Sequence, residues 1–406
     1  MTDKPKPLSQ RMGAIEPFRV MEILARAKTL EAQGRSIVHM EIGEPDFPTP
    51  RPICEAGIRA LEKGDLFYTS ALGSPELRAA IARYYGTRYG VNVSPERIVI
   101  TSGSSGALLL AMGVLVDPGA RVLLSDPGYP ANRNFVRLFN GEPVSVPVGP
   151  DSNYQMTPEL LEHYWSEDTV AAIVATPSNP TGTLIASGDL SAMASFASSR
   201  GGTLIVDEIY HGLVYEGTTR TALELDDDVF VINSFSKFFN MTGWRLGWMV
   251  APERCISHID KLAQNVYLSP SAPAQRAALA AFEPETLAIL DARREEFRAR
   301  RDYLVPALRA LGFDIAQTPQ GAFYVYAGCS RLTEDSLRFS LDLLEDAGVA
   351  ITPGIDFGSH RASEHVRFAY TNSIERLQEG VERIRAFIAV APRNRDISHT
   401  ARGASP

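Results

Sequence analysis

Cysteine is scarce in this sequence, and basic residues are outnumbered by acidic ones. The 406 residues include only three cysteines, Cys54, Cys255 and Cys329. Their odd number and wide separation suggest neither a disulfide framework nor a zinc knuckle, and fit a reducing compartment. The net charge of -8 argues against a nucleic-acid partner, because phosphate backbones are bound by clustered lysine and arginine.

The sequence also lacks an apolar run long enough to span a membrane. Residues 1–17 are polar and contain prolines, without the apolar core of a signal peptide. We therefore expect a cytoplasmic protein with no membrane partner.

Three phosphate-binding or hydrolase motifs are missing as well. The sequence contains neither G-x-G-x-x-G after a strand nor G-x-x-x-x-G-K-[ST], so dinucleotide and nucleoside-triphosphate sites lose support. G-x-S-x-G is absent, which weakens a serine-hydrolase interpretation.

What is present is the pattern of an α/β protein with two domains. With 45% hydrophobic residues the chain can form two cores. Short β-branched or apolar runs alternate with helical stretches between about 98 and 250, which predicts a large domain with a mostly parallel, doubly wound sheet. The predicted strands are 97–103, 121–127, 142–148, 170–177, 202–208, 229–236 and 245–251.

A change of pattern predicts a second, smaller α+β domain. Residues 274–311 have helical spacing, as one long helix or two, and strands are predicted at 312–319, 321–328, 348–354 and 365–371. We expect an N-terminal arm (1–45) that packs with the small domain, a large domain (46–284), a small domain (285–393) and a mobile tail (394–406).

Polar residues follow the predicted strands at their carboxyl ends, where open parallel sheets bind ligands. They are Ser104, Ser105, Tyr129, Asn179, Asp207 and the run from Ser234 to Lys237. Ser104 and Ser105 start an apolar helix, so backbone N–H groups and hydroxyls there suit a phosphate dianion, although serine capping of an ordinary helix explains them equally well.

The segment from Ser234 to Gly247 is the most informative one. It places Lys237 beside two hydroxyls, Ser234 and Ser236, with Arg245 eight residues later. A partly desolvated lysine is a usable nucleophile toward a carbonyl, and Arg245 with the serines can hold a phosphate. The alternative is a surface lysine and arginine flanking a turn, which the surrounding aromatic and apolar residues disfavour.

Asp207 closes an apolar strand and needs a cationic partner, for which a pyridinium nitrogen would serve. Tyr210 and Asn179 could hydrogen-bond a phenolic oxygen of the same ring. A helix cap is an equal alternative for Asp207, and a metal site with Glu208 and His211 is a minor one.

Three further residues are ambiguous on sequence alone. Tyr129 could stack on a planar ring or simply pack within a proline-rich turn, and Tyr68 is similar. Arg367 lies inside an apolar strand and therefore needs a carboxylate partner, which is either internal or a substrate.

Together these residues resemble the class I and II aminotransferases, which are fold-type I pyridoxal-phosphate enzymes. The resemblance covers nearly the whole chain, and its specific parts are SNPTG at 178–182, DEIY at 207–210 and the segment from SFSK to WRLG at 234–247.

The resemblance implies a role for each matching residue. Lys237 would be the Schiff-base lysine and proton carrier, Asp207 would contact the pyridine nitrogen, and Tyr210 and Asn179 the ring oxygen. Tyr129 would stack on the ring, Arg367 and Gly43 would bind the substrate α-carboxylate, and Tyr68 would reach the cofactor phosphate of the neighbouring subunit. The residues implied around the phosphate are Ser104, Ser105, Ser234, Ser236 and Arg245. A homodimer with shared active sites, no metal, and pyridoxal 5'-phosphate as cofactor are implied.

We expect ping-pong transfer of an amino group from an L-amino acid, with alanine, another neutral amino acid or aspartate as donor and 2-oxoglutarate as acceptor. Residues 265–267 and Tyr324 are candidates for side-chain selection, and no arginine there suits a second substrate carboxylate. A β-lyase on the same fold is the alternative. A transcription regulator would need an added DNA-binding module, which this sequence does not show.

Overall fold

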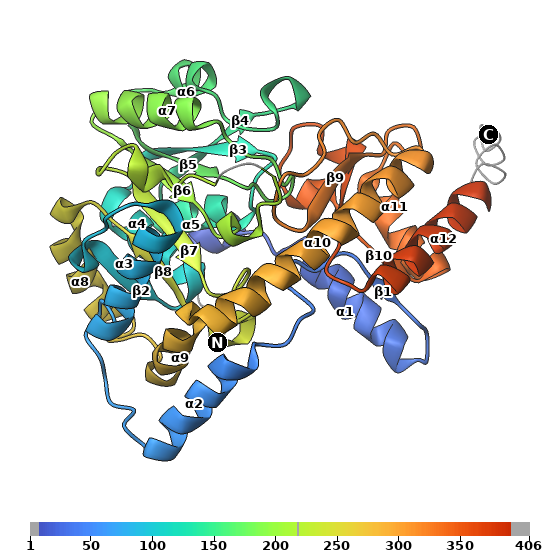
Figure 1. Ribbon diagram of the computed structural model, residues 1–406. Coiled ribbons are helices and arrows are strands. Elements are labelled where there is room, and N and C mark those ends of the chain that lie inside the picture. The colour runs from blue at the N-terminus through green and yellow to red at the C-terminus, as the bar shows by residue number, and fades with distance from the viewer. Residues whose placement is uncertain (1–7, 217–218, 391–406) are drawn as a thin grey trace, which may run out of the picture.

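The central strands assemble into one seven-stranded sheet in the computed structural model, which describes residues 8–216 and 219–390 (Figure 1). The strand order is β2-β8-β7-β6-β5-β3-β4. The bounds are β2 (Ile98–Thr101), β3 (Arg121–Asp126), β4 (Glu142–Pro147), β5 (Thr169–Ala175), β6 (Thr203–Asp207), β7 (Phe230–Ser234) and β8 (Gly247–Val250). All pairings are parallel except those of β8, which runs antiparallel to β2 and β7. The predicted mostly parallel sheet is confirmed.

Both faces of the sheet are buried, which explains why its strands are continuously apolar. In β6, Leu204 and Val206 pack into one apolar cluster while Ile205, between them, packs into a second cluster on the opposite face. One face is covered by α3 (Pro75–Tyr89), α6 (Pro158–Tyr164) and α7 (Ser187–Ser199), and the other by α4 (Gly103–Leu115), α5 (Ala131–Leu138) and α8 (Glu253–Val266). The doubly wound arrangement is therefore also confirmed.

The smaller domain contains a three-stranded antiparallel sheet in the order β11-β12-β9. Its elements are β9 (Tyr324–Gly328), α11 (Ser336–Asp342), β10 (Val349–Ala350), β11 (Thr352–Pro353), β12 (His365–Ala369) and α12 (Ile374–Val390). The stretch predicted as one helix or two forms α9 (Ala272–Ala278) and then α10 (Pro284–Ala310), which runs from the large domain to the small one (Figure 1).

The strand predicted at 312–319 is wrong. Only Asp314 pairs there, in an isolated antiparallel bridge with Gly328. Phe313 and Ile315 are 3% and 4% exposed, so the apolar residues that suggested a strand instead pack a loop into the core. The strand predicted at 348–354 is divided into the short strands β10 and β11.

Residues 19–39 pack with the small domain, whereas Arg11, Ala14 and Glu16 form hydrogen bonds with helix α5 of the large domain. The segment contributes α1 (Arg19–Ala32), which contacts β10 and β11, and β1 (Val38–His39), which pairs in parallel with β10. Helix α2 (Arg51–Lys63) then leads to the large domain. The domain boundaries proposed from the sequence, at 45, 284 and 393, stay predictions, and the proposed tail at 394–406 lies outside the described residues. No helix among the described residues is both long and apolar enough to cross a membrane.

Gly247 sets how closely β8 approaches the start of α4. A Cβ added to Gly247 would lie 2.6 Å from the carbonyl carbon of Gly103 and 2.8 Å from the nitrogen of Ser104. Because these are backbone atoms, Gly247→Ala should lower the free energy of unfolding by about 1–3 kcal/mol, measured by chemical denaturation. Gly188→Ala is the control, since nothing lies within 4 Å of its Cβ position. Equal stability of the two variants would contradict this packing argument.

Candidate active site

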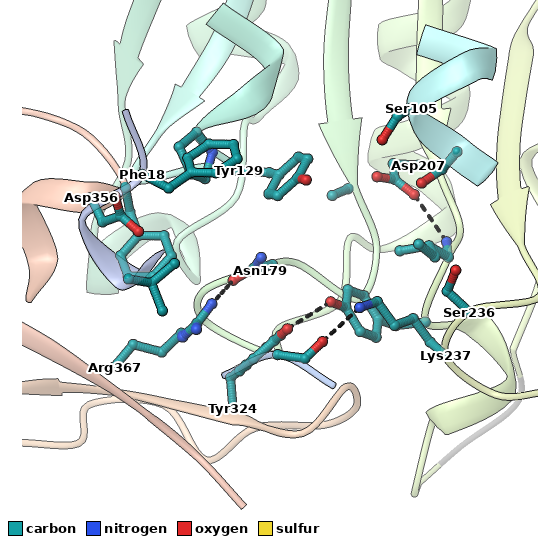
Figure 2. Close-up of a pocket in the computed structure, with 18 of the residues that line it drawn as sticks. Phe18, Ser105, Tyr129, Asn179, Asp207, Ser236, Lys237, Tyr324, Asp356 and Arg367 are labelled. Atoms are coloured by element: carbon teal, nitrogen blue, oxygen red, sulfur yellow. Dashed lines mark hydrogen bonds between the residues drawn. The ribbon is translucent and has the colours of Figure 1, made fainter. Parts of the chain in front are cut away.

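A cavity of about 260 Å³ lies at the carboxyl ends of the parallel strands, where the two domains and the N-terminal segment meet. The sheet register places Ala175, Asp207 and Ile232 side by side, so β5, β6 and β7 end at the same edge. The lining includes eleven of the residues predicted from sequence: Gly43, Ser104, Ser105, Tyr129, Asn179, Asp207, Tyr210, Ser236, Lys237, Arg245 and Arg367. Figure 2 shows Asp207, Ser105 and Ser236 at one end of this cavity and Arg367 at the other.

One end of the cavity is built to attract an anion. Ser104 and Ser105 lie in the first turn of α4, whose free N–H groups and dipole carry partial positive charge. Arg245, in the left-handed region at φ 54°, reaches the same place, and a Cβ on Gly103 would lie only 2.7 Å from its Nη2. A guanidinium and a helix N-terminus repel each other mildly, and an anion between them would remove that repulsion.

The two serines before Lys237 do different things. Ser236 lines the cavity, but Ser234 is buried behind it at 1% exposure. Ser234 Oγ lies 3.0 Å from Ser236 Oγ and 3.2 Å from the Leu246 carbonyl, and it accepts the Ser236 N–H at 3.1 Å. Ser236 therefore lies where a bound anion could contact it, and Ser234 supports it from behind.

Lys237 projects into the middle of the cavity from the turn after β7. Its Nζ donates a hydrogen bond to the Gly43 carbonyl at 2.6 Å. Burial lowers the Lys237 pKa to about 8, with Arg367 and Arg245 acting in the same direction and Glu44 opposing them. A substantial neutral fraction of this amine is therefore available near physiological pH, as nucleophilic attack on a carbonyl requires.

Asp207 is the acidic group of the site. It ends β6, is 7% exposed, and accepts the Ile209 N–H at 3.0 Å. Burial raises its pKa to about 6, opposed by that hydrogen bond and by Lys237. A cation bound in the cavity beside Asp207 would stabilise the carboxylate form.

Tyr210, Tyr324 and Gly43 form one wall. The hydroxyl oxygens of Tyr210 and Tyr324 are 2.9 Å apart. A Cβ on Gly43 would lie 2.1 Å from the Tyr324 hydroxyl oxygen, so only glycine allows the backbone to approach so closely. Tyr324, which the sequence suggested only for side-chain selection, is thus part of the central wall.

Arg367 occupies the opposite end from Arg245. It donates to Asn179 Oδ1 at 2.9 Å and to the Glu41 carbonyl at 2.5 Å, and lies over the rings of Tyr324 and Phe357 at 4.2 and 4.8 Å. These hydrogen-bond partners are neutral, and within the described residues its Nε has none. The guanidinium charge is therefore available to a bound carboxylate.

The alternative of a metal site at Asp207, Glu208 and His211 is not supported. The described part of the chain holds no group of three His, Cys, Asp or Glu residues able to bind a metal ion. Glu208 instead accepts hydrogen bonds from the Thr221 hydroxyl and the Ala222 N–H. Burial raises the Glu208 pKa to about 8 and lowers that of the adjacent His211 to about 3. At neutral pH this pair is therefore largely uncharged and belongs to the core.

Comparison with known proteins identifies the family. The family model for aminotransferases of class I and II matches residues 35–384. This chain belongs to that family. It is a pyridoxal-phosphate-dependent aminotransferase with the fold-type I architecture.

Relatives of this aminotransferase carry several different substrate names. It is 40% identical to a (5-formylfuran-3-yl)methyl phosphate transaminase of Methanocaldococcus jannaschii, over 94% of this chain and 99% of that protein. It is also 40% identical to a valine–pyruvate aminotransferase of Mycobacterium tuberculosis, over 96% and 99%. Among solved structures, aspartate aminotransferase from Thermus thermophilus with maleate matches at 35% identity and a TM-score of 0.89, over 94% and 99%.

The residues of the aminotransferase cavity fit the cofactor. Its phosphate suits the anion-attracting end at Ser105 and Arg245, its ring nitrogen suits the buried carboxylate of Asp207, and its aldehyde suits the amine of Lys237. Bound there, pyridoxal phosphate supplies an electron sink for a carbanion at the substrate Cα.

Several lining residues were not predicted from the sequence. Phe18, Val20 and Met21 come from the start of α1, and Asp356 and Phe357 from the small domain. Their proximity depends on long-range packing, because Asp356 Oδ1 accepts the Arg19 N–H at 2.8 Å. Conversely, Tyr68 is 82% exposed and does not line this chain's cavity, and residues 265–267 do not line it either.

The lowered pKa of Lys237 predicts the pH dependence of cofactor uptake. An amine is neutral above its pKa, so the rate at which cofactor-free enzyme binds pyridoxal phosphate should rise with pH and reach half its plateau near pH 8. Stopped-flow absorbance measures it, with N-acetyl-lysine amide as the control amine, whose midpoint is about 10.4. A midpoint for the enzyme close to that of the free amine would contradict the desolvated position of Lys237.

Proposed function

We propose that this aminotransferase moves the amino group of a neutral aliphatic L-amino acid, such as alanine or valine, to a small 2-oxo acid. The observation that carries the proposal is the charge of the cavity. Its lining cations are Arg245 at the phosphate end, Lys237 in the middle and Arg367 at the far end. The end of the cavity at Arg367 is also lined by the apolar rings of Phe18 and Phe357 and by the carboxylate of Asp356, a poor environment for a second substrate carboxylate (Figure 2).

The same charge pattern favours pyruvate over the expected 2-oxoglutarate as acceptor, and disfavours aspartate as donor. The similarity to a valine–pyruvate aminotransferase agrees with this choice. Relatives named aspartate aminotransferases make the dicarboxylic pair the main competitor. A cation from a neighbouring subunit is the feature that would favour that competitor.

The proposed roles of the residues follow from their positions. Arg367, assisted by Asn179 and the backbone at Gly43, holds the substrate α-carboxylate. Lys237 Nζ takes the proton from the substrate Cα and returns it during the transfer, as its pKa near 8 permits. Asp207 keeps its negative charge beside the ring nitrogen. The first product leaves before the second substrate enters, which gives ping-pong kinetics.

Steady-state kinetics with a matrix of substrates tests the proposed specificity. Alanine, valine and aspartate serve as donors, with pyruvate and 2-oxoglutarate as acceptors. Neutral donors should exceed aspartate in kcat/KM by about tenfold or more, because aspartate would bring an unpaired carboxylate beside Asp356. Lys237→Ala, which removes the acid–base amine, should be inactive with every pair. A preference for aspartate with 2-oxoglutarate would contradict the proposal.

We also propose that the enzyme is a homodimer whose two active sites share residues. Large apolar side chains are exposed on α2, on the loop after it and at residue 268, which precedes the α9 helix that packs against α2: Ile58 at 52%, Leu61 at 60%, Phe67 at 78%, Tyr68 at 82% and Leu268 at 57% exposure. Exposed apolar side chains on these segments support burial against a second copy. In that dimer, Tyr68 reaches the phosphate of the cofactor that is bound by the neighbouring subunit.

The dimer proposal predicts an effect of a surface residue on cofactor binding. Tyr68→Phe should weaken pyridoxal-phosphate affinity by about tenfold, because it removes one hydrogen bond to a charged group. Equilibrium titration by cofactor absorbance measures it, with sedimentation to confirm the dimer. Tyr303→Phe, on α10 and outside the cavity lining, is the control. A fully active monomer, or unchanged affinity in the Tyr68 variant, would refute the shared site.

A cytoplasmic location is part of the proposal. It is supported by the free state of all three cysteines, two of them partly exposed, which a reducing compartment maintains.

A further inference from the structure

Three successive backbone carbonyls connect the N-terminal segment to the site. The Glu41 carbonyl accepts from Arg367 at 2.5 Å, the Ile42 carbonyl from the Thr371 hydroxyl at 3.1 Å, and the Gly43 carbonyl from Lys237 at 2.6 Å. The Thr352 hydroxyl also donates to the Glu41 carbonyl at 3.0 Å. The position of residues 41–43 therefore sets where two functional side chains point.

The Glu41 side chain is held by an ion pair away from the cavity. It is 0% exposed, and its Oε1 lies 2.7 Å from His39 Nδ1. His39 Nε2 lies 3.1 Å from Oε1 of Glu31 on α1. The hydrogen bond to Glu41 is the main cause that raises the His39 pKa to about 9, against the effect of burial, so the imidazole carries a positive charge at neutral pH.

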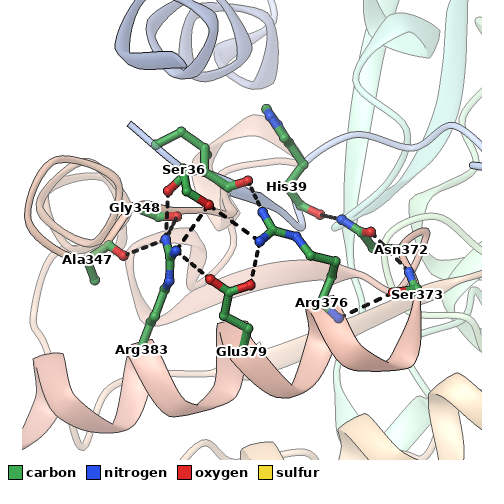
Figure 3. A network of polar contacts seen from close by, with 10 residues as sticks. Ser36, His39, Ala347, Gly348, Asn372, Ser373, Arg376, Glu379 and Arg383 are labelled. Carbon is green, nitrogen blue, oxygen red and sulfur yellow. Dashed lines mark hydrogen bonds and ion pairs between the residues drawn. The ribbon is translucent and has the colours of Figure 1, made fainter. Parts of the chain in front are cut away.

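The backbone on the other side of this pair is fixed independently. Arg376 and Arg383, on α12, donate to the carbonyls of Ile37 at 2.6 Å and Ser36 at 2.7 Å. Figure 3 shows both arginines around Glu379, beneath the segment that leads to His39. Residues 36 and 37 are anchored by α12, Met40 exchanges backbone hydrogen bonds with Ala350 and Ala369, and the Ile42 carbonyl is held by Thr371. Loss of the ion pair should therefore shift the Glu41 carbonyl locally and leave Gly43 and the rest of the segment in place.

We propose that His39 and Glu41 are positioning residues for substrate binding: their ion pair fixes the Glu41 carbonyl, which orients the Arg367 guanidinium toward the substrate α-carboxylate. The inference rests on the proposed role of Arg367. Glu31 also links this ion pair to α1, and Val20 and Met21, in the first turn of α1, line the cavity.

The test compares a donor that has an α-carboxylate with one that lacks it. Single-turnover half-reactions of the holoenzyme with L-valine and with isobutylamine are followed by cofactor absorbance. Glu41→Ala should raise the half-saturating concentration of L-valine about tenfold, leave its maximal rate within about twofold, and leave isobutylamine nearly unchanged. Glu41→Gln keeps an oxygen that can accept from His39 and should give an intermediate effect.

The controls separate positioning from general damage. Glu345→Gln breaks the exposed ion pair between Arg26 of α1 and Glu345 without touching His39 or Glu41. This variant should leave the half-saturating concentration and the maximal rate unchanged for both donors. The inference is overturned if the Glu41 variants lose apparent affinity equally for both donors, or lose it for neither. If Glu41→Ala does not fold, Glu41→Gln decides by the same criterion, with an expected loss of about threefold for L-valine alone.

Arg367→Lys distinguishes this inference from the proposed function. It should remove the preference for L-valine over isobutylamine. If Arg367→Lys retains that preference, the proposed α-carboxylate site itself is wrong. If Arg367→Lys loses it while both Glu41 variants retain wild-type values, only the positioning inference fails.

Discussion

The site depends on one constraint: an amine and a carboxylate, Lys237 and Asp207, are buried in the same cavity at the ends of adjacent strands. Burial brings the two pKa values toward neutrality, to about 8 and about 6, because desolvation disfavours the charged form of each group. Among the described residues, neither group is neutralised by a close ion pair. Both are therefore suited to interact with an aldehyde and a pyridinium, and we propose this as the electrostatic basis of cofactor binding in the enzyme.

The architecture supplies the remaining groups from distant parts of the chain. Parallel strands bring their carboxyl ends to one edge of the sheet, and the antiparallel return of β8 places Arg245 beside the start of α4. The small domain contributes Arg367, and the N-terminal segment contributes backbone carbonyls that orient both Arg367 and Lys237. Cations at the two ends of the cavity then define how a phosphate and a substrate carboxylate can be accommodated.

The sequence predicted those parts of the site that depend on local pattern. Asp207 and Lys237 were found because polar residues directly after buried strands stand out against an apolar background. The same reasoning could not separate Ser234 from Ser236, since only the fold shows that one lies behind the other. It missed Asp356 and the His39–Glu41 pair, whose contacts join residues on separate elements, and it mistook the buried loop at 312–319 for a strand. Tyr68 lies outside this chain's cavity, so the role proposed for it requires a second subunit.

The proposed attachment of the cofactor to Lys237 can be tested directly. Borohydride reduction of the holoenzyme fixes an amine–aldehyde linkage permanently, and peptide mass spectrometry then locates it. We expect the mass of a pyridoxyl phosphate group on the peptide that contains Lys237, at close to one per chain. The group on a different lysine, with Lys237 unmodified, would contradict the assignment of Lys237 as the cofactor-binding lysine.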